Sequence, residues 1–232
     1  MKKQPSRVLL QTTNTVQHVV IWLSKYQRHL YLFGSVVLLG TVGRVSFTYY
    51  QREKNQVAQS EMFQAVYFFE QSAFDKALHG DGTYVGLLDI VKEYPFTQAT
   101  NLAHLYIGIS YMHQKEYTKA IKYLTKFRSR DLLLRARAWA LIGDAYTENK
   151  NYKSAATYYV KAANYKANEV FSPIYLVKAA LAYEANKHFK EALSCYQRII
   201  KEYPNARQYG VACKHVARLQ GIDAATHHPS SD

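Results

Sequence analysis

The sequence is poor in the residue types that mark several protein classes. Among its 232 residues are two cysteines, too few for a disulfide-rich miniprotein or a four-cysteine zinc site. Ten glycines and five prolines are also too few for a collagen-like chain or for one made mainly of linkers. Because 48% of the residues are apolar and 20% are charged, wholesale disorder is excluded and the chain must bury a core.

Acidic residues are absent from the first 50 positions, which hold six lysines and arginines. The rest of the chain has 24 basic and 17 acidic residues, so its excess of positive charge is less one-sided. A basic excess is typical of nucleic-acid-binding proteins. Here the strongest asymmetry coincides with a hydrophobic stretch, so the sequence favours a membrane explanation. We therefore expect no nucleic-acid partner.

The hydrophobic stretch runs from Leu30 to Tyr50 and carries a single charge, at Arg44. As a helix its 21 residues would measure about 31 Å, which matches the hydrocarbon core of a bilayer. Arg44 lies in the last third, where a long side chain can reach the interface. A cleaved signal peptide is the alternative, but no small-residue cleavage site follows and the leader would be long. The sequence thus predicts an uncleaved anchor at residues 30–50.

Positive residues on the two sides of this span predict its orientation. Five lysines and arginines precede it, and two follow closely at positions 52 and 54. By the positive-inside rule, residues 1–29 form a basic cytoplasmic segment and the following domain lies across the membrane. Within the N-terminal segment, residues 15–28 are equally consistent with an interfacial helix and with a flexible lead-in.

Beyond Arg52 the apolar residues recur every three or four positions, which is typical of helices. Comparison of the chain with itself reveals a repeat of 35 to 37 residues, in which a small residue, a tyrosine, an alanine and a bulky residue keep their offsets. The four sets are Gly108, Gly143 and Ala180; Tyr111, Tyr146 and Tyr183; Ala120, Ala155 and Ala192; and Leu124, Tyr159 and Tyr196. A small residue beside a large one predicts helix hairpins that bury a face by stacking.

This pattern resembles the tetratricopeptide repeat, a helix hairpin of about 34 residues. The second unit carries most of the family's signature: Trp139, Ile142, Gly143, Tyr146, Ala155, Tyr159 and Ala162. The first and third units depart from it at His104 and Leu176, where the family favours tryptophan. The resemblance implies an all-α fold in which the repeats form a solenoid of helix hairpins. The single transmembrane helix predicted at residues 30–50 precedes this solenoid.

The repeat register divides the part beyond the anchor into units. Residues 101–204 are predicted to form three repeats, and residues 53–100 a degenerate first unit with a long helix, an interruption and a helix ending at Tyr94. Residues 205–221 are predicted to form a capping helix that ends at Gly221. Residues 222–232 are predicted to form a disordered polar tail.

No pattern in the sequence indicates a catalytic, cofactor or metal site. The glycines around Asp81 invite a phosphate-loop or calcium-loop interpretation, but the flanking strand and the remaining ligands are missing. We therefore expect a tight connection between helices there. His227 and His228 lack the further ligands of a metal site. Cys195 and Cys213 lie close enough to pair in an oxidising compartment, although two buried free thiols are the preferred interpretation.

The surface of interest is the inner wall of the solenoid, lined by the first helix of each hairpin. The predicted partner-binding residues are Leu105, Ile109, Met112, His113, Arg137, Asp144, Thr147, Glu148, Val177, Leu181 and Glu184. We expect an apolar wall for protein or peptide clients, with an acidic patch at Asp144, Glu148 and Glu184. A solvated acidic face without a binding role is the equal alternative. The lysines and asparagines that would grip a peptide carboxylate are absent, which disfavours that class of ligand.

The basic N-terminus, the anchor and the repeat body together resemble the ancillary subunit of the bacterial Sec translocon. The runs Gly80–Tyr84 and Asn101–His104 are similar to Bacteroidetes-type members of that group. The resemblance implies a single-pass inner-membrane protein with a periplasmic repeat domain that binds polypeptide clients. A scaffold subunit of an envelope-assembly complex is the alternative, although its lipidated example needs a cysteine near the N-terminus, and the first one here is Cys195. An enzyme is a lesser alternative.

Overall fold

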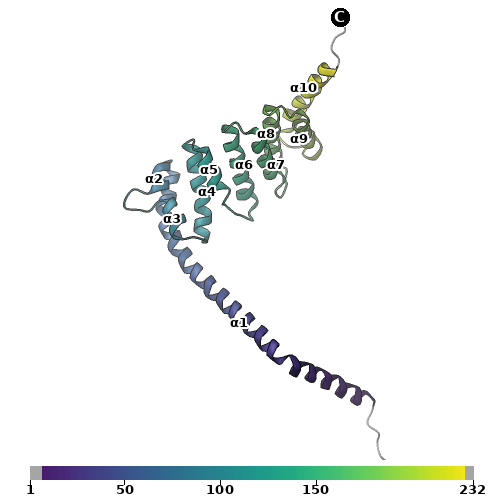
Figure 1. Cartoon of the computed structure of the whole chain (residues 1–232). Helices are drawn as coiled ribbons and strands as arrows, with labels where there is room; N and C mark the ends of the chain where they lie inside the picture. Colours follow the sequence, from purple (N-terminus) through teal and green to yellow (C-terminus); the bar gives the residue numbers. More distant parts are fainter. Residues whose placement is uncertain (1–6, 228–232) are drawn as a thin grey trace, which may run out of the picture. The chain divides into compact units, whose positions relative to one another are not determined.

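A computed structural model describes the backbone of residues 7–227 and the side chains of residues 28, 29 and 31–221. This part of the chain forms ten helices and no strand, which confirms the all-α prediction (Figure 1). The helices are α1 (Arg7–Glu70), α2 (Phe74–His79), α3 (Leu87–Glu93), α4 (Gln98–His113), α5 (Tyr117–Leu124), α6 (Leu132–Glu148), α7 (Tyr152–Asn164), α8 (Ser172–Ala185), α9 (Phe189–Glu202) and α10 (Tyr209–His227).

The chain divides into two compact units, Met1–Glu53 and Lys54–Asp232. The described part of the first unit is the N-terminal portion of α1. Residues 31–50 of this helix are exposed throughout, and within the described residues Tyr31–Glu70 is long and apolar enough to cross a membrane by length and composition. Residues 15–28 are helical, as in the interfacial-helix alternative, whereas residues 1–6 of the predicted cytoplasmic segment lie outside the described residues.

The second unit contains the three predicted hairpins, α4–α5, α6–α7 and α8–α9, and α10 packs against α9. Each hairpin turns at a lysine in the left-handed conformation, at positions 115, 150 and 187. The following backbone N–H donates back to the carbonyl of the repeated tyrosine, as in Glu116 to Tyr111 at 2.9 Å and Asn151 to Tyr146 at 2.9 Å. This bond satisfies a carbonyl at the end of the first helix and fixes the register of the turn.

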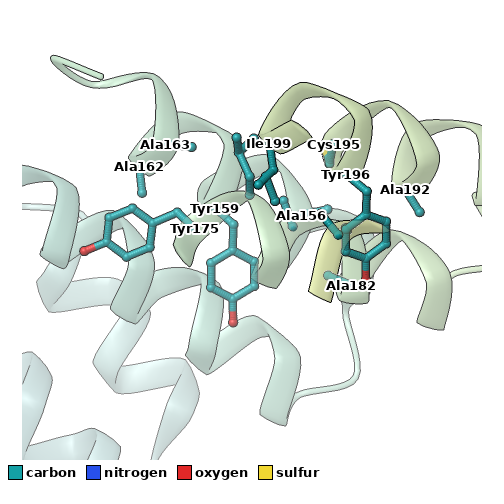
Figure 2. Close-up of a cluster of buried hydrophobic side chains, with 14 of the residues drawn as sticks. Ala156, Tyr159, Ala162, Ala163, Tyr175, Ala182, Ala192, Cys195, Tyr196 and Ile199 are labelled. Atoms are coloured by element: carbon teal, nitrogen blue, oxygen red, sulfur yellow. The ribbon is translucent and has the colours of Figure 1, made fainter. Parts of the chain in front are cut away.

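The small and large residues of the repeat meet where the two helices of a hairpin cross. A Cβ atom added to Gly143 would lie 2.6 Å from a ring carbon of Tyr159, and one added to Gly108 would lie 2.4 Å from Cγ of Leu124. Figure 2 shows the rings of Tyr159 and Tyr196 among alanines of the C-terminal core. The predicted crossing is therefore confirmed, because only a small residue permits this approach.

Two predicted features of the chain differ in the structure. The interruption predicted within residues 53–100 contains a short helix, α2, and the loop after it is closed by a bridge between Gly80 and Val85. Asp81 accepts hydrogen bonds from the backbone N–H groups of Thr83 and Tyr84, at 3.0 and 2.9 Å. The glycines therefore belong to a tight connection, as expected.

The second difference concerns the C-terminus. Helix α10 passes through Gly221 and ends at His227, so the predicted helix end and the predicted start of the tail at residue 222 are wrong. Gly221 does not adopt the left-handed conformation that would stop the helix. The alanines that follow it are strong helix formers. Residues 228–232 lie outside the described residues.

Candidate functional site

The first helices of the hairpins, α4, α6 and α8, carry the predicted partner-binding residues. A cavity of about 480 Å³ lies between α6 and α8 and is also lined by residues of the α7–α8 connection. Two predicted residues, Arg137 and Asp144, line it. The other lining side chains are mostly apolar, and they include Leu133, Ala140 and Ile174. The cavity thus offers an apolar floor with an exposed guanidinium on its wall.

Several residues of this cavity were not among the predicted partner-binding residues. Tyr165 and Phe171 come from the α7–α8 connection, and Lys178 comes from α8. Lys178 also lines a smaller hollow of about 170 Å³ together with Thr147 and Leu181, which were predicted. Lys178 stands 34 residues after Asp144, and Arg218 stands 34 residues after Glu184. That shared spacing is the signal in the sequence that would have found both cations.

The predicted acidic patch is largely neutralised within the domain. Asp144 accepts hydrogen bonds from the Tyr159 hydroxyl and from Lys178 Nζ, both at 2.7 Å. Glu184 accepts from the Tyr196 hydroxyl at 2.9 Å and pairs with Arg218 of α10. Neither the open acidic patch nor the solvated acidic face describes these two carboxylates, because each has partners within the domain. Those partners are Lys178, at a position of α8 outside the wall register, and side chains of α7, α9 and α10.

Glu148 and Glu184 make further contacts within the domain. Glu148 is exposed, and among the described residues it accepts a hydrogen bond from the Tyr117 hydroxyl at 3.3 Å and pairs with no cation. His215 Nδ1 lies 3.1 Å from Glu184. Burial alone would raise the pKa of Glu184, but hydrogen bonds from Arg218, Tyr196 and His215 hold that pKa below its ordinary value. Glu184 is therefore a structural carboxylate that joins α8 to α10.

The part of the wall on α4 is mostly covered. Leu105 is 6% exposed and belongs to the core, while Ile109 and Met112 are partly buried against the same core. His113 is exposed but stacks on Phe74 of α2, with ring centroids 4.2 Å apart. The predicted apolar floor therefore does not run along all three helices.

On α8 the two predicted apolar residues differ in exposure. Val177 is partly buried against the C-terminal core, whereas Leu181 is 48% exposed. Together with Arg137, Asp144 and Thr147, these residues place the open part of the wall on α6 and α8. The binding role of the predicted residues stays a prediction.

Comparison with protein families agrees with this geometry. Tetratricopeptide repeat models match residues 107–169 and residues 175–206. The chain contains tetratricopeptide repeats. The matches begin within α4 and end just after α9. They therefore cover the hairpins that line the cavity but not the degenerate repeat unit predicted at residues 53–100. Comparison with curated proteins finds no match to the chain.

Tetratricopeptide repeats are typically protein-interaction elements without catalytic activity. Within the described residues no group of three or more histidine, cysteine or acidic side chains gathers in a way that would hold a metal ion. Both cysteines of the repeat region are free; Cys195 is buried, and Cys213 is partly exposed rather than buried as preferred from the sequence. Burial raises the pKa of the Cys195 thiol to about 11, so this thiol stays protonated and packs as a small apolar group.

Proposed function

We propose that this protein is a membrane-anchored interaction module whose tetratricopeptide repeats bind a polypeptide segment of a client or partner protein. The observation that carries the proposal is the cavity between α6 and α8, on the wall formed by the first helices of the repeats. Its volume of about 480 Å³ lies in the range of ligand sites and suits one or two apolar side chains of a bound segment.

The chemistry of the cavity narrows the kind of segment. Leu133 and Ile174 are 51% and 36% exposed, so they offer apolar surface that a bound side chain would cover. Arg137 is exposed beside them, while the carboxylate of Asp144 is already paired with Lys178. Arg137 is thus the cation without a carboxylate partner in the described cavity wall. We infer that the cavity prefers an apolar segment with an acidic or neutral flank, in place of the basic client suggested by an open acidic patch.

Site-specific photocrosslinking in native membranes tests this proposal. A photoreactive residue at position 133 or 174 should capture a polypeptide, and one at position 157 should not, because Thr157 lies exposed on α7 away from the cavity. In addition, Arg137→Glu should reduce the yield of captured material while leaving helicity unchanged. Equal capture from all three positions would show that the cavity is not the binding site.

We propose the anchor and its orientation on separate grounds. The apolar length of α1 and the excess of lysine and arginine before residue 30 support an N-terminus in the cytoplasm and a repeat domain in the bacterial periplasm. Protease added to intact spheroplasts should then digest residues beyond 53. Protection of the repeat domain until lysis would contradict this orientation.

The layout of a basic segment, an anchor and repeats supports a role as an ancillary factor of the Sec translocon that holds emerging polypeptides or bridges to periplasmic chaperones. The alternative is a scaffold subunit of an envelope-assembly complex. The two roles differ in the neighbours that the crosslinks capture. Capture of many unfolded secretory chains together with translocon subunits favours the first, whereas capture of one stable set of assembly proteins favours the second.

A further inference from the structure

The connections from the second helix of one unit to the first helix of the next follow one another along one edge of the second unit. They are residues 94–97, 125–131, 165–171 and 203–208, which we call the connector edge. Hydrogen bonds tie the 125–131 connection to its neighbours: Asn101 Nδ2, in the first turn of α4, donates to the carbonyl of Arg128 at 2.7 Å, and Lys166 Nζ donates to the carbonyl of Arg130 at 2.9 Å.

The connector edge exposes apolar side chains at regular intervals. When each connection is taken together with two residues on either side, each contains an exposed large apolar residue. These residues are Phe96, Leu133, Val170 and Tyr209. The exposed fractions of Phe96 and Val170 are 87% and 63%. Phe96 also holds a φ of 66°, an uncommon conformation for an aromatic residue, and this backbone presents its ring to solvent. These side chains leave apolar surface that a partner could cover.

The opposite edge, made of the turns at residues 71–73, 114–116, 149–151 and 186–188, is different. Three of these turns have a lysine at the left-handed position, and the fourth has Ser72. By the same count among the described residues, Phe189 is the large apolar side chain exposed there, at 45%. The apolar residues are thus concentrated at one end of the hairpins.

The 125–131 connection of the connector edge also carries positive charges that no carboxylate pairs with. The 125–131 connection has Lys126, Arg128 and Arg130 against Asp131, whose carboxylate caps α6 by accepting from the N–H of Leu134 at 2.9 Å. Arg128 donates to backbone carbonyls instead of acids. None of the ion pairs in the described part of the chain includes these three cations. The edge is therefore suited to an anionic partner.

Connectivity decides which anionic partner is within reach. The second unit begins at Lys54, four residues after the expected end of the span at Tyr50. Asn55 accepts a hydrogen bond from the N–H of Ala99 in the first turn of α4, at 2.9 Å, so the chain enters the unit at the connector edge. Four residues extend over no more than about 14 Å, so the point at which the chain enters the second unit, beside the 94–97 connection, is tethered near the expected end of the span.

We propose that the connector edge docks on the membrane surface. Phe96 and Val170 enter the interfacial region, and Arg128 and Arg130 pair with anionic phospholipid headgroups. Isolated apolar side chains between cations are the pattern of interfacial binding, whereas a stable protein interface needs a contiguous apolar core. This proposal rests on the proposed anchor. Docking would hold the repeat groove at a fixed height above the bilayer.

Nitroxide labels on the full chain in lipid vesicles test the proposal. In a background of Cys195→Ala and Cys213→Ala, single labels are introduced through Phe96→Cys, Val170→Cys, the opposite-edge control Phe189→Cys and the anchor control Val37→Cys. In phosphatidylcholine vesicles that contain phosphatidylglycerol, labels at 96 and 170 should be shielded from a polar relaxation agent and accessible to oxygen. The label at 189 should stay in water.

The outcomes separate this proposal from the one on which it rests. A label at 37 exposed to water would overturn the anchor, and with it the docking. A label at 37 in lipid with labels at 96 and 170 as exposed to water as the label at 189 would overturn the docking alone. Protection of 96 and 170 in native membranes but not in the vesicles would assign the edge to a protein partner and would also overturn the lipid assignment.

The charge contribution has its own test. Arg130→Gln should lower the ratio of docked to free domain, read from the two components of the spectrum of a label at 170, by about fivefold in vesicles with phosphatidylglycerol. The matched control Lys190→Gln, an exposed residue beside an opposite-edge turn, should leave the ratio unchanged. High salt should act like Arg130→Gln. An unchanged ratio for Arg130→Gln would rule out the headgroup contact.

Discussion

The α4–α5 and α6–α7 hairpins share one crossing of a small and a large residue, but the large residue differs. In α4–α5 it is Leu124, whose side chain packs on Gly108 and has no polar group that could reach the wall. In α6–α7 it is Tyr159, whose ring packs on Gly143 and whose hydroxyl reaches the wall at Asp144. In α8–α9 the equivalent Tyr196 donates to Glu184.

This difference shows that the second helix of a hairpin helps to set the polarity of the wall formed by the first. Beside Leu124 the wall residues of α4 are apolar and partly buried. Beside a tyrosine, the wall carries a carboxylate that has a hydroxyl donor and a cation from the following unit. Those cations also join consecutive units, so the C-terminal half has polar links across its stack in addition to apolar packing.

Overpacking the tyrosine crossing should give the largest effect. In Gly143→Leu the new side chain would overlap the Tyr159 ring, which the hydroxyl contacts hold in place. We expect unfolding to become easier by about 3 kcal/mol, measured by urea denaturation. Gly210→Ala is the matched control, because nothing lies within 4 Å of a Cβ atom there. Equal stability of both variants would mean that the crossing tolerates volume.

The next prediction compares His104 with Trp139, which occupies the same repeat position in the next unit. Burial lowers the pKa of His104 from 6.5 to about 4, with Lys126 adding to the shift, and its Nδ1 is buried without a partner. On acidification the unfolded chain therefore takes up the proton first. The stabilisation is complete above about pH 6.5 and is lost as the pH falls toward 4.

Allowing for partial exposure, this loss should amount to about 2 kcal/mol. His104→Phe should flatten the fall of the urea midpoint between these pH values, because phenylalanine has no proton to gain. His79→Gln, at an exposed histidine, should leave the fall as it is. The same slope in both variants would show that other groups carry the pH dependence.

Removing one hydroxyl tests the polar link directly. Tyr159→Phe keeps the ring on Gly143 but leaves Asp144 and Thr147 without a shared partner, at original distances of 2.7 and 3.1 Å. We expect a loss of about 1 kcal/mol in the free energy of unfolding. Tyr117→Phe, whose hydroxyl lies 3.3 Å from an exposed carboxylate, should change it by less than half as much.

The sequence predicted the hairpins because their determinants are local. Gly143, Tyr146 and Tyr159 recur at fixed spacing, and each acts within one hairpin. The sequence did not predict α2 or the extension of α10 to His227, where neither a repeat signature nor a stop signal decides the helix boundaries.

For the site, the repeat register correctly placed Arg137 and Asp144 on the cavity wall. It missed Lys178, because that side chain reaches the wall from a position outside the register used. It also missed Tyr165 and Phe171, because connections between repeats vary in length and have no fixed register. Because the register missed Lys178, the sequence did not predict that Asp144 is neutralised. The spacing of 34 residues between these two side chains is visible only when consecutive repeats are compared.

The smallest expected effect distinguishes the two ion pairs that link consecutive units. The two carboxylates differ in exposure, 30% for Asp144 and 14% for Glu184, while their cations Lys178 and Arg218 are 41% and 48% exposed. Water screens the pair with the more exposed carboxylate, so a double-mutant cycle of Asp144→Asn with Lys178→Met should give a coupling of about 0.5 kcal/mol. The cycle of Glu184→Gln with Arg218→Met should give a larger coupling, because desolvation strengthens the attraction. If the couplings are equal, exposure does not decide the strength of these links. Consecutive units are then held together mainly by apolar packing, which neither cycle changes.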